Sequence, residues 1–342
     1  MNLLVSGGAG FIGSHFARLM LQKHPDAKVV VLDALTYAGN PKNIEDLPKD
    51  RCCLVQGRIQ DPKTVADAIQ ENGITHIVNF AAETHNDRSI LRPGSFIRTD
   101  VFGAFVLCEA ARKFDQIERF VHVSTDEVYG SIASGRFTEA SPIQPNTPYS
   151  ASKAGGDLQC RAQFIAFGTP VIVTRGGNNY GPYQYPEKLI PFFVTRLIDG
   201  KKVPLYGDGS QVREWIHVLD HCEGIETVLL KGEPGQVYNI GDSNERQNRE
   251  IVRMLLEETG RDESLVKSIP DPRKAAHDAR YSMDSDKVRS LGWEPTRDFG
   301  KELRSVVRWY KERQDWWRPI TQSPGYTDFV RDFYGKSLGE DL

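Results

Sequence analysis

The sequence has no apolar stretch long enough to cross a membrane. Hydrophobic residues make up 39% of its 342 positions, but no run of them approaches the roughly 20 residues that a bilayer span requires. Met1 leads directly into a short apolar segment with no basic region before it, which is not the pattern of a secretory signal peptide. We therefore expect a protein with no membrane partner.

Cysteine is scarce, and the charge is nearly balanced. The five cysteines are odd in number and lack the spacing of metal ligands, which predicts reduced thiols in a cytoplasmic protein and no metal site. No partner that would activate a catalytic thiol is evident beside them. A formal net charge of -3 argues against nucleic acid as the main partner and leaves only a local basic groove open. Repeats and low-complexity segments are absent from the sequence.

What the sequence does contain is an alternation of short apolar strands and helices. Such alternation predicts an α/β fold with a Rossmann-type, doubly wound parallel sheet and right-handed crossovers. The predicted strands are 2–5, 28–32, 53–56, 75–82, 119–124 and 170–174, and the predicted helices are 14–24, 63–70 and 101–113.

A shift toward proline, glycine and tyrosine after the sixth strand predicts a domain boundary. We assign residues 1–178 to the Rossmann domain and 179–342 mainly to a smaller C-terminal α/β domain that binds the substrate. A helix predicted at 215–230 and a strand at 237–240 could return to the first sheet, so 212–242 are assigned to it. Further helices are predicted at 250–258 and 299–314.

A glycine-rich turn follows the first predicted strand. Gly7, Gly10 and Gly13 fall three residues apart where strand should give way to helix, and this pattern is typical of a dinucleotide site. Backbone N–H groups at the helix start would attract the phosphates. The second strand ends at Asp33, about 20 residues after the last glycine, where a carboxylate accepts from ribose hydroxyls and repels a 2′-phosphate. The turn therefore predicts NAD rather than NADP, the alternative being an ordinary glycine-rich turn.

Tyr149 and Lys153 lie four residues apart at the start of a predicted helix, and this spacing places both on one helical face. An ammonium group beside a phenol favours phenolate, so Lys153 is predicted to lower the pKa of Tyr149 and make it a usable base. The alternative is a chance surface pair.

Two adjacent carboxylates, Asp126 and Glu127, follow the fifth predicted strand. Because ligands of such sheets bind at the carboxyl ends of the strands, we expect both acids at the cofactor crevice. Neighbouring carboxyl groups push each other's pKa values apart, so one can donate a proton while the other accepts one. Such a pair could eliminate water next to a newly formed carbonyl, whereas a solvated acidic turn is the alternative.

These motifs resemble those of the dTDP-glucose 4,6-dehydratases, in the extended short-chain dehydrogenase/reductase superfamily. The resemblance covers nearly the whole chain and is strongest at 81–89, 124–130, 149–153 and 178–191. It implies a lyase that dehydrates dTDP-glucose to dTDP-4-keto-6-deoxyglucose by C4 oxidation, elimination across C5 and C6, and hydride return to C6. NAD is regenerated within each turnover, so it should stay tightly bound.

The resemblance also implies a role for each catalytic residue. Tyr149 takes the proton of the 4-hydroxyl, and Lys153 assists it and holds the nicotinamide ribose. Thr125 hydrogen-bonds near the 4-oxygen. Glu127 removes the C5 proton, and Asp126 protonates the departing 6-hydroxyl.

Matching residue by residue, the resemblance implies two sets of binding residues. Those expected at NAD are Gly7, Gly10, Phe11, Ile12, Gly13, Asp33, Ala34, Leu35, Thr36, Arg58, Ile59, Phe80, Ala81, Ala82, Thr99, Tyr149, Lys153 and Asn179. Those expected at the nucleotide sugar are Thr84, Thr125, Asn178, Lys188, Leu189, Pro204, Leu205, Tyr206, Arg213, Asn248, Arg273 and His277. Tyr206 could stack on the base, and the guanidinium fork of Arg213 suits a diphosphate.

Three segments depart from the family's pattern. Arg58 stands where an acidic residue is usual before Ile59. Residues 175–177 read Arg-Gly-Gly, which predicts extra room in front of the following asparagines. The loop that normally grips the diphosphate corresponds to 271–277, where Arg273 or Lys274 could supply the cation.

Other functions remain open on the sequence. The same dehydration could act on UDP-glucose or UDP-N-acetylglucosamine. A nucleotide-sugar 4-epimerase would keep the Tyr–Lys pair but lack the two acids, and an NAD-sensing regulatory protein need not keep both features. The family is usually a homodimer joined through two helices, here predicted at 101–113 and 151–167.

Overall fold

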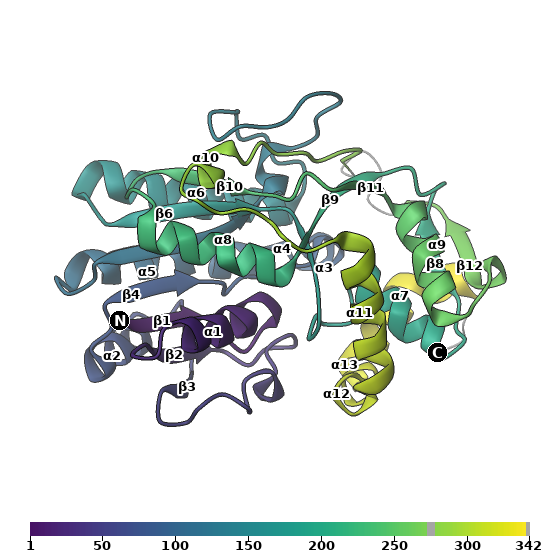
Figure 1. The fold of residues 1–342 in the computed structure, drawn as a ribbon, viewed down its shortest axis with the longest axis horizontal. Helices are drawn as coiled ribbons and strands as arrows, with labels where there is room; N and C mark the ends of the chain where they lie inside the picture. The colour runs from purple at the N-terminus through teal and green to yellow at the C-terminus, as the bar shows by residue number, and fades with distance from the viewer. Residues whose placement is uncertain (272–277, 340–342) are drawn as a thin grey trace.

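A seven-stranded parallel sheet forms the centre of the computed structural model, which describes residues 1–271 and 278–339 (Figure 1). Its strand order is β10-β6-β5-β4-β1-β2-β3, so the predicted Rossmann-type fold is confirmed. The strands are β1 Asn2–Ser6, β2 Lys28–Asp33, β3 Cys52–Gln56, β4 His76–Asn79, β5 Arg119–Thr125, β6 Val171–Gly176 and β10 Val237–Ile240.

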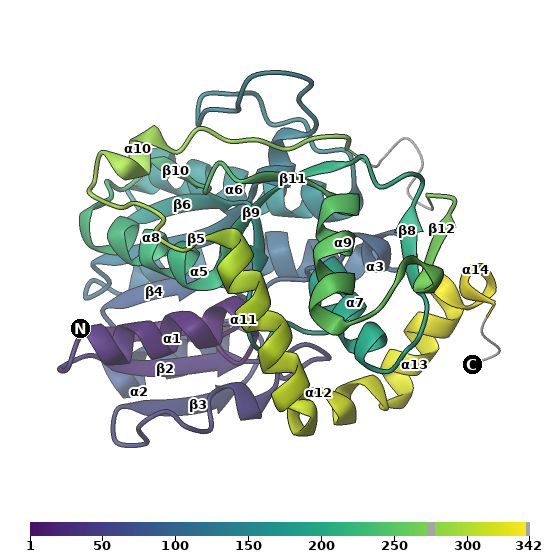
Figure 2. The same cartoon turned by 45° about the vertical axis from the view of Figure 1, so that its right-hand side comes forward.

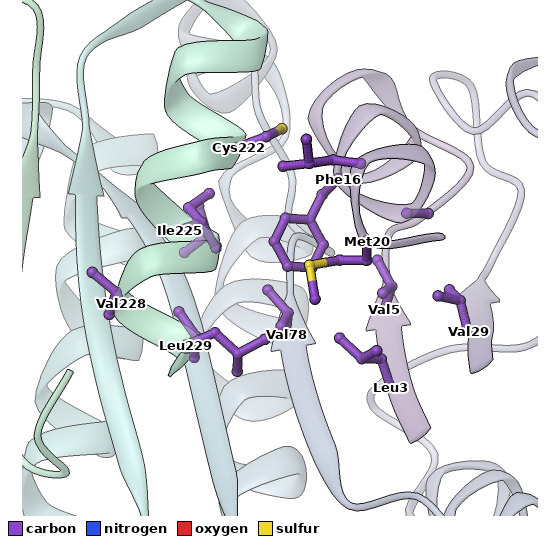
Figure 3. Packing of buried hydrophobic residues seen from close by; sticks show 14 of the residues in the cluster. Leu3, Val5, Phe16, Met20, Val29, Val78, Cys222, Ile225, Val228 and Leu229 are labelled. Carbon is purple, nitrogen blue, oxygen red and sulfur yellow. The ribbon is translucent and has the colours of Figure 1, made fainter. Parts of the chain in front are cut away.

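Helices cover both faces of this sheet. On one face, α1 (Phe11–Lys23) packs beside α8 (Val218–Lys231), and Figure 3 shows Phe16 of α1 and Ile225 of α8 meeting over Leu3 of β1. On the other face are α2 (Pro62–Asn72), α5 (Ala104–Lys113) and α6 (Pro148–Phe167), which pack over a buried cluster that includes Leu4 of β1. Successive strand residues point to opposite faces, so an uninterrupted apolar strand supplies both cores.

After β6 the chain leaves this sheet, and it returns to it with β10. β10 pairs in parallel with β6 through Val237–Ile240. The helix predicted at 215–230 was wrong at its start, because residues 215–217 are not helical. They complete strand β9 (Val212–His217), and α8 begins only at Val218, where the side chain of His217 accepts from the N–H of Leu219.

A smaller unit lies beyond the carboxyl ends of the parallel strands (Figure 2). Its helices are α7 Leu189–Ile198, α9 Asn248–Thr259, α11 Phe299–Glu312, α12 Gln314–Thr321, α13 Pro324–Val330 and α14 Lys336–Leu338. Two small sheets accompany them: β7 (Asn178–Tyr180), β9 and β11 (Glu245–Gln247), and the pair β8 (Val203–Tyr206) with β12 (Val266–Ile269). This unit has its own aromatic core, which includes Trp316 and Trp317.

Two element boundaries differ from the sequence expectation in ways that affect the site. β4 ends at Asn79, so Phe80–Ala82 form a loop after the strand rather than its last three residues. The predicted helix over 101–113 is α-helical only from Ala104, because Ile97–Gly103 form a π-helix that follows α3 (Asn86–Leu91) and α4 (Pro93–Phe96). π-Helical turns occur often near functional sites.

Short elements complete the described chain. These are the 3₁₀ turns η1 (Pro41–Asn43), η3 (Asp126–Tyr129) and η4 (Glu263–Leu265), the helix α10 (Asp286–Arg289) and the π-helix η6 (Arg331–Gly335). Within residues 1–271 and 278–339, no helix is both long enough and apolar enough to cross a bilayer.

Candidate active site

A cavity of about 400 Å³ lies where the carboxyl ends of the parallel strands face the smaller unit. Its walls include the loops after β1, β2, β3, β4, β5 and β6, together with residues of α7, β8 and β9. Ligands of open α/β sheets bind in this crevice. The cavity is therefore the candidate site for both a cofactor and a substrate.

The glycine turn at one end of the cavity can be built only from glycine. Gly7 has φ +71, and a Cβ there would lie 2.5 Å from the backbone nitrogen of Ala81. A Cβ on Gly13 would lie 2.4 Å from the carbonyl oxygen of Gly7. Helix α1 starts at Gly10, which has no side chain to cap it, so the N–H groups of the first turn line an open cradle. This cradle fits the pyrophosphate of a dinucleotide.

Asp33 ends β2 beside that cradle and is buried. Its two carboxylate oxygens accept from the backbone N–H groups of Ala9 (3.0 Å) and Leu35 (2.8 Å). Burial raises the pKa of Asp33 above its usual value, and the two N–H donors oppose that shift. The carboxylate is thus fixed in place, with lone pairs left for ribose hydroxyls.

The structure brings the predicted NAD residues together with one exception. Leu35 has φ +48 and does not line the cavity, because its N–H turns back to Asp33. The predicted residues that do line it are Gly7, Gly10, Phe11, Ile12, Gly13, Asp33, Ala34, Thr36, Arg58, Ile59, Phe80, Ala81, Ala82, Thr99, Tyr149, Lys153 and Asn179.

The five predicted catalytic residues line the middle of the same cavity. Thr125 ends β5, and Asp126 and Glu127 open the 3₁₀ turn η3 that follows it. The Thr125 hydroxyl donates to Asp126 Oδ1 at 2.9 Å and accepts from the Glu127 N–H at 3.3 Å. Tyr149 and Lys153 lie in the first two turns of α6. The end of β5 and the start of α6 therefore bring these five side chains to one cavity.

Asp126 has the surroundings of a proton donor. Its side chain is buried, and Oδ2 has no hydrogen-bond partner among the described residues. Burial raises the pKa of Asp126 well above its usual value, and the adjacent carboxylate of Glu127 raises it further. Both effects disfavour the charged form. Asp126 thus holds a proton at a pH where an ordinary aspartate is ionised.

Glu127 is held by a short chain of side chains that the sequence reasoning missed. Asn86, at the start of α3, donates to Glu127 Oε2 at 2.7 Å. The Asn86 carbonyl oxygen accepts from the hydroxyl of Thr147 at 2.8 Å. Thr147 in turn caps α6, because its oxygen accepts from the N–H of Ser150. The position of the Glu127 carboxylate is therefore coupled to the start of the helix that carries Tyr149.

Burial dominates the pKa of Tyr149, and the expected effect of Lys153 on it stays a prediction. Burial raises the pKa of Tyr149 well above its usual value, and Glu127 adds to the rise, while Thr125 opposes it. The ammonium of Lys153 donates to the carbonyl of Val123 at 2.8 Å and is absent from the main influences on the phenol. The protein alone therefore keeps Tyr149 neutral, and a further positive charge is needed to favour phenolate.

Asp100 is a further buried acid close to the Tyr–Lys pair. Asp100 accepts from the hydroxyl of Ser152 at 2.6 Å and from the N–H of Glu83 at 2.9 Å. Burial raises the pKa of Asp100 to about 6, against a smaller opposing effect of Lys153. Asp100 thereby ties helix α6 to the loop after β4, which continues into Thr84.

The predicted substrate residues that the structure describes also line the cavity. These are Thr84, Thr125, Asn178, Lys188, Leu189, Pro204, Leu205, Tyr206, Arg213 and Asn248. Lys188 donates to the carbonyl of Thr84, which joins the smaller unit to the loop after β4. Arg273, Lys274 and His277 lie outside the described residues.

Two of these side chains have protein partners that the sequence did not indicate. The hydroxyl of Tyr206 lies 3.3 Å from Asp87 Oδ2 and 3.2 Å from the hydroxyl of Tyr334. Arg213 donates to the carbonyl of Asp278 at 2.9 Å and lies 4.5 Å over the ring of Tyr281. Stacking of Tyr206 on a base and binding of Arg213 to a diphosphate remain predictions.

The room expected beside Gly176 and Gly177 is filled. A Cβ on Gly176 would lie 2.5 Å from Nε2 of His221, which projects from α8. The glycine therefore makes space for a histidine that itself lines the cavity. The ring of His221 is hydrogen-bonded to Asn179 at 3.0 Å. The glycine at 176, which departs from the family's pattern, therefore helps to position Asn179, a predicted cofactor residue.

The cavity contains further polar side chains that sequence reasoning did not single out. They include Asn86, Asp87, Glu187, Tyr281 and Tyr334. The sequence signal was strongest for Glu187, which directly precedes the predicted Lys188. Tyr334 gave no signal, because it reaches the cavity from the far end of the chain. Among the described residues, no cluster of three or more histidines, cysteines or acids is arranged to hold a metal ion.

Comparisons with known proteins agree with this geometry. A crystal structure of a dTDP-glucose 4,6-dehydratase from Streptomyces venezuelae, solved with NAD and dTDP bound, matches with a TM-score of 0.89 at 50% identity. The match covers 94% of this chain and 100% of that one. A UDP-glucose 4-epimerase from Thermus thermophilus, in complex with NAD, matches with a TM-score of 0.83 at 29% identity over 91% of this chain and 99% of that one. The fold and site define a member of the extended short-chain dehydrogenase/reductases.

The sequence comparisons narrow the assignment from this superfamily to one family within it. A family model described as GDP-mannose 4,6 dehydratase matches residues 4–306. A dTDP-glucose 4,6-dehydratase from Streptomyces niveus is 48% identical over 339 residues, covering 95% of this chain and 99% of the relative. One from Mycobacterium tuberculosis is 42% identical over 325 residues, covering 94% of this chain and 96% of the relative. The chain belongs to the dTDP-glucose 4,6-dehydratase family.

Proposed function

We propose that this protein converts dTDP-glucose to dTDP-4-keto-6-deoxyglucose with an NAD that it recycles internally. The observation that carries the proposal is the meeting of Asp126, Glu127 and Tyr149 in one cavity with a dinucleotide cradle at its end. A dehydrogenase needs only the phenol and the cradle. A proton donor and a carboxylate base beside them add the means to eliminate water.

Each catalytic residue has a role that its surroundings support. Bound NAD supplies the hydride acceptor for C4, a positive charge beside the phenol, and the hydride that returns to C6. Tyr149 accepts the proton of the sugar 4-hydroxyl. The resulting carbonyl acidifies C5, and Glu127, oriented by Asn86, removes the C5 proton. Asp126, kept protonated by burial, gives its proton to the departing 6-hydroxyl, so that water leaves.

The binding roles follow the two ends of the cavity. The glycine turn and Asp33 hold the NAD pyrophosphate and ribose, and Lys153 holds the nicotinamide ribose. The residues of the smaller unit that line the cavity hold the nucleotide of the substrate. Tyr206 supports the base from β8, and Arg213 supports the diphosphate from β9.

A comparison of three substrates distinguishes this proposal from a dehydratase that acts on a UDP-sugar and from a 4-epimerase. The purified enzyme is incubated, without added cofactor, with dTDP-glucose, UDP-glucose and UDP-N-acetylglucosamine in separate reactions. We expect a 4-keto-6-deoxy product, detected by its absorbance in base, from dTDP-glucose first. Product from a UDP-sugar alone would reassign the nucleotide. A 4-epimer with no keto product would replace the dehydratase with an epimerase.

We also propose a homodimer in the cytoplasm. Most of the large apolar side chains that remain exposed belong to α3, the π-helix Ile97–Gly103 (η2), α5 and α6: Ile90, Leu91, Ile97, Phe102, Phe105, Leu158, Ile165 and Phe167. Apolar side chains gathered on one face support association with a second copy. The odd number of cysteines, without the spacing of a disulfide framework, supports a reducing compartment.

A further inference from the structure

A buried ionic contact joins three separate wall segments behind the cavity. Glu187, in the loop before α7, accepts from the hydroxyl of Tyr37 at Oε1 (3.0 Å) and from Nε of Arg88 at Oε2 (2.9 Å). The side chain of Glu187 is only 2% exposed, whereas that of Arg88 is 22% exposed. Each oxygen of one carboxylate thus binds a different segment of the chain. Charge-assisted hydrogen bonds of this kind are stronger than neutral ones.

The guanidinium of Arg88 is also held between two rings. It lies 4.0 Å from the ring centre of Tyr37 and 4.2 Å from that of Phe329 in α13. Tyr37 meets Tyr185 edge to face at 5.3 Å. Arginine between aromatic faces gains from cation–π attraction. Phe329 lies beyond residue 306, where the match to the family model ends.

The joined segments are the walls on both sides of the expected cofactor. Thr36, Ala38 and Gly39 line the cavity from the turn after β2, whereas the intervening Tyr37 does not. Glu187 lines the opposite wall, in the smaller unit. Arg88 lies outside the cavity, two residues after Asn86, which orients Glu127. The contact therefore fastens the adenosine-side turn to the smaller unit without Tyr37 or Arg88 reaching the cavity.

We infer that Tyr37, Arg88 and Glu187 form a closure network that keeps NAD in the cavity between turnovers. The inference rests on the proposed function, because a cofactor recycled within each turnover must outlast many of them. The turn at 36–39 and the loop at Glu187 both line the cavity, so separating them would open the space expected to hold NAD. The network holds these two segments together, so Tyr37 and Arg88 are positioning residues rather than catalytic ones.

The test compares NAD release from Tyr37→Phe and Arg88→Lys with release from the wild-type enzyme. Tyr37→Phe keeps the ring beneath Arg88 but removes one hydrogen bond to a carboxylate, and Arg88→Lys keeps the charge but removes the flat cation between the rings. Enzyme purified with its NAD is diluted, and the NAD that escapes is measured over time. We expect about tenfold faster release from each variant, the size of effect that one hydrogen bond to a charged group has.

Tyr238→Phe is the matched control. It also removes a hydroxyl that is hydrogen-bonded, here to the N–H of Glu233 at 3.0 Å, but it lies in β10 away from the cavity lining. Its release rate should equal that of the wild type. Unchanged release from Tyr37→Phe and Arg88→Lys, or equally fast release from Tyr238→Phe, would overturn the inference.

A second measurement separates retention from chemistry. With saturating added NAD, kcat of Tyr37→Phe should return to the wild-type value; a kcat that stays low would place the network in catalysis and contradict the inference. The release experiment needs no substrate. If the wild-type enzyme failed to dehydrate dTDP-glucose while the variants still released NAD faster, the proposed function would fail and the closure network would stand.

Discussion

Asp126 and Glu127 are neighbours in the chain, yet their carboxyl groups have different surroundings. Asp126 is buried with one oxygen lacking a partner among the described residues, whereas Glu127 is only half-buried and accepts from the Asn86 amide. The difference arises because η3 turns the two side chains in different directions from the end of β5. One site thereby offers a proton donor and an oriented carboxylate within a single turn.

Asp126→Asn should stop the reaction after the first oxidation. The amide cannot give a proton to the leaving hydroxyl, and loss of a general acid typically costs about 10²-fold or more in rate. We expect kcat for the keto product to fall by at least that amount. Reduced nicotinamide should then accumulate and be visible by its near-ultraviolet absorbance. Normal dehydration by this variant would remove Asp126 as the acid.

Asp100 makes stability depend on pH in the mildly acidic range. Its pKa rises from 3.8 in the unfolded chain to about 6 in the folded protein, so the folded state binds the proton more tightly. This contribution to stability is complete below the unfolded pKa and is lost as the pH rises through the folded pKa. Asp100→Asn removes the titrating group. Relative to wild type, the variant should therefore gain stability, by roughly 3 kcal/mol, between about pH 4 and pH 7.

Thermal melts of both proteins across that range measure this difference. The gap between the two Tm curves should widen as the pH rises. Parallel curves would mean that Asp100 does not change its protonation on unfolding.

The residue types of the site could be predicted from the sequence, but their partners could not. Gly7, Asp33, Asp126 and Tyr149 stand in local motifs, where spacing along the chain reports geometry. Asn86 is 41 positions from Glu127, and no pattern within one segment reveals such a contact. The sequence also could not show that burial raises the pKa of Tyr149, because burial depends on the whole fold.

Helix α6 links fold stability to catalysis through its first turn. Thr147 and Ser150 form a capping box in which each side chain accepts from the other's backbone N–H. Such a cap contributes on the order of 1 kcal/mol. Because the Thr147 hydroxyl also donates to Asn86, the same atom helps to position Glu127.

Thr147→Val should therefore lower both stability and kcat. The valine keeps the shape but leaves the helix uncapped and the Asn86 carbonyl without its donor. Urea unfolding should show a loss of about 1–2 kcal/mol, and kcat should fall several-fold. The control is Asp298→Ala, which removes the side-chain cap of α11, outside the cavity lining. It should cost similar stability with unchanged kcat, and an equal loss of kcat would contradict the coupling.

Strands and helices with a clear apolar period were predicted well. The boundary between two elements that follow each other without a loop was not. Strands β1, β2, β3 and β5 lie within a residue or so of their expected ranges. Residues 215–230 were predicted as one helix because β9 leads into α8 without an intervening loop. An apolar run of that kind does not reveal where the period changes from 2 to 3.6.

At the scale of the whole molecule, the site belongs to neither unit alone. The Rossmann sheet supplies the cradle and the catalytic groups, and the smaller unit supplies the opposite wall. Glu187 and Lys188 connect the two, through Tyr37, Arg88 and the carbonyl of Thr84. This arrangement encloses the reacting groups and limits the access of water, which strengthens electrostatic interactions within the cavity.

The exposed apolar face predicts the oligomeric state. Leu158 and Ile165 on α6 are 52% and 62% exposed, and a second copy would cover them. The wild type should sediment as a dimer, and Leu158→Arg with Ile165→Arg should sediment as a monomer. Leu230→Arg on α8, at a leucine that is 42% exposed, should remain dimeric. A monomeric wild type would refute this assembly.

The central claim is that hydride taken from C4 returns to C6 of the same sugar. It is tested most directly with dTDP-glucose carrying deuterium at C4, incubated with the enzyme in ordinary water without added cofactor. Mass and NMR spectra of the product should place that deuterium in the C6 methyl group, with a solvent proton at C5. Deuterium lost to water, or retained at C4 of an epimerised sugar, would contradict the account.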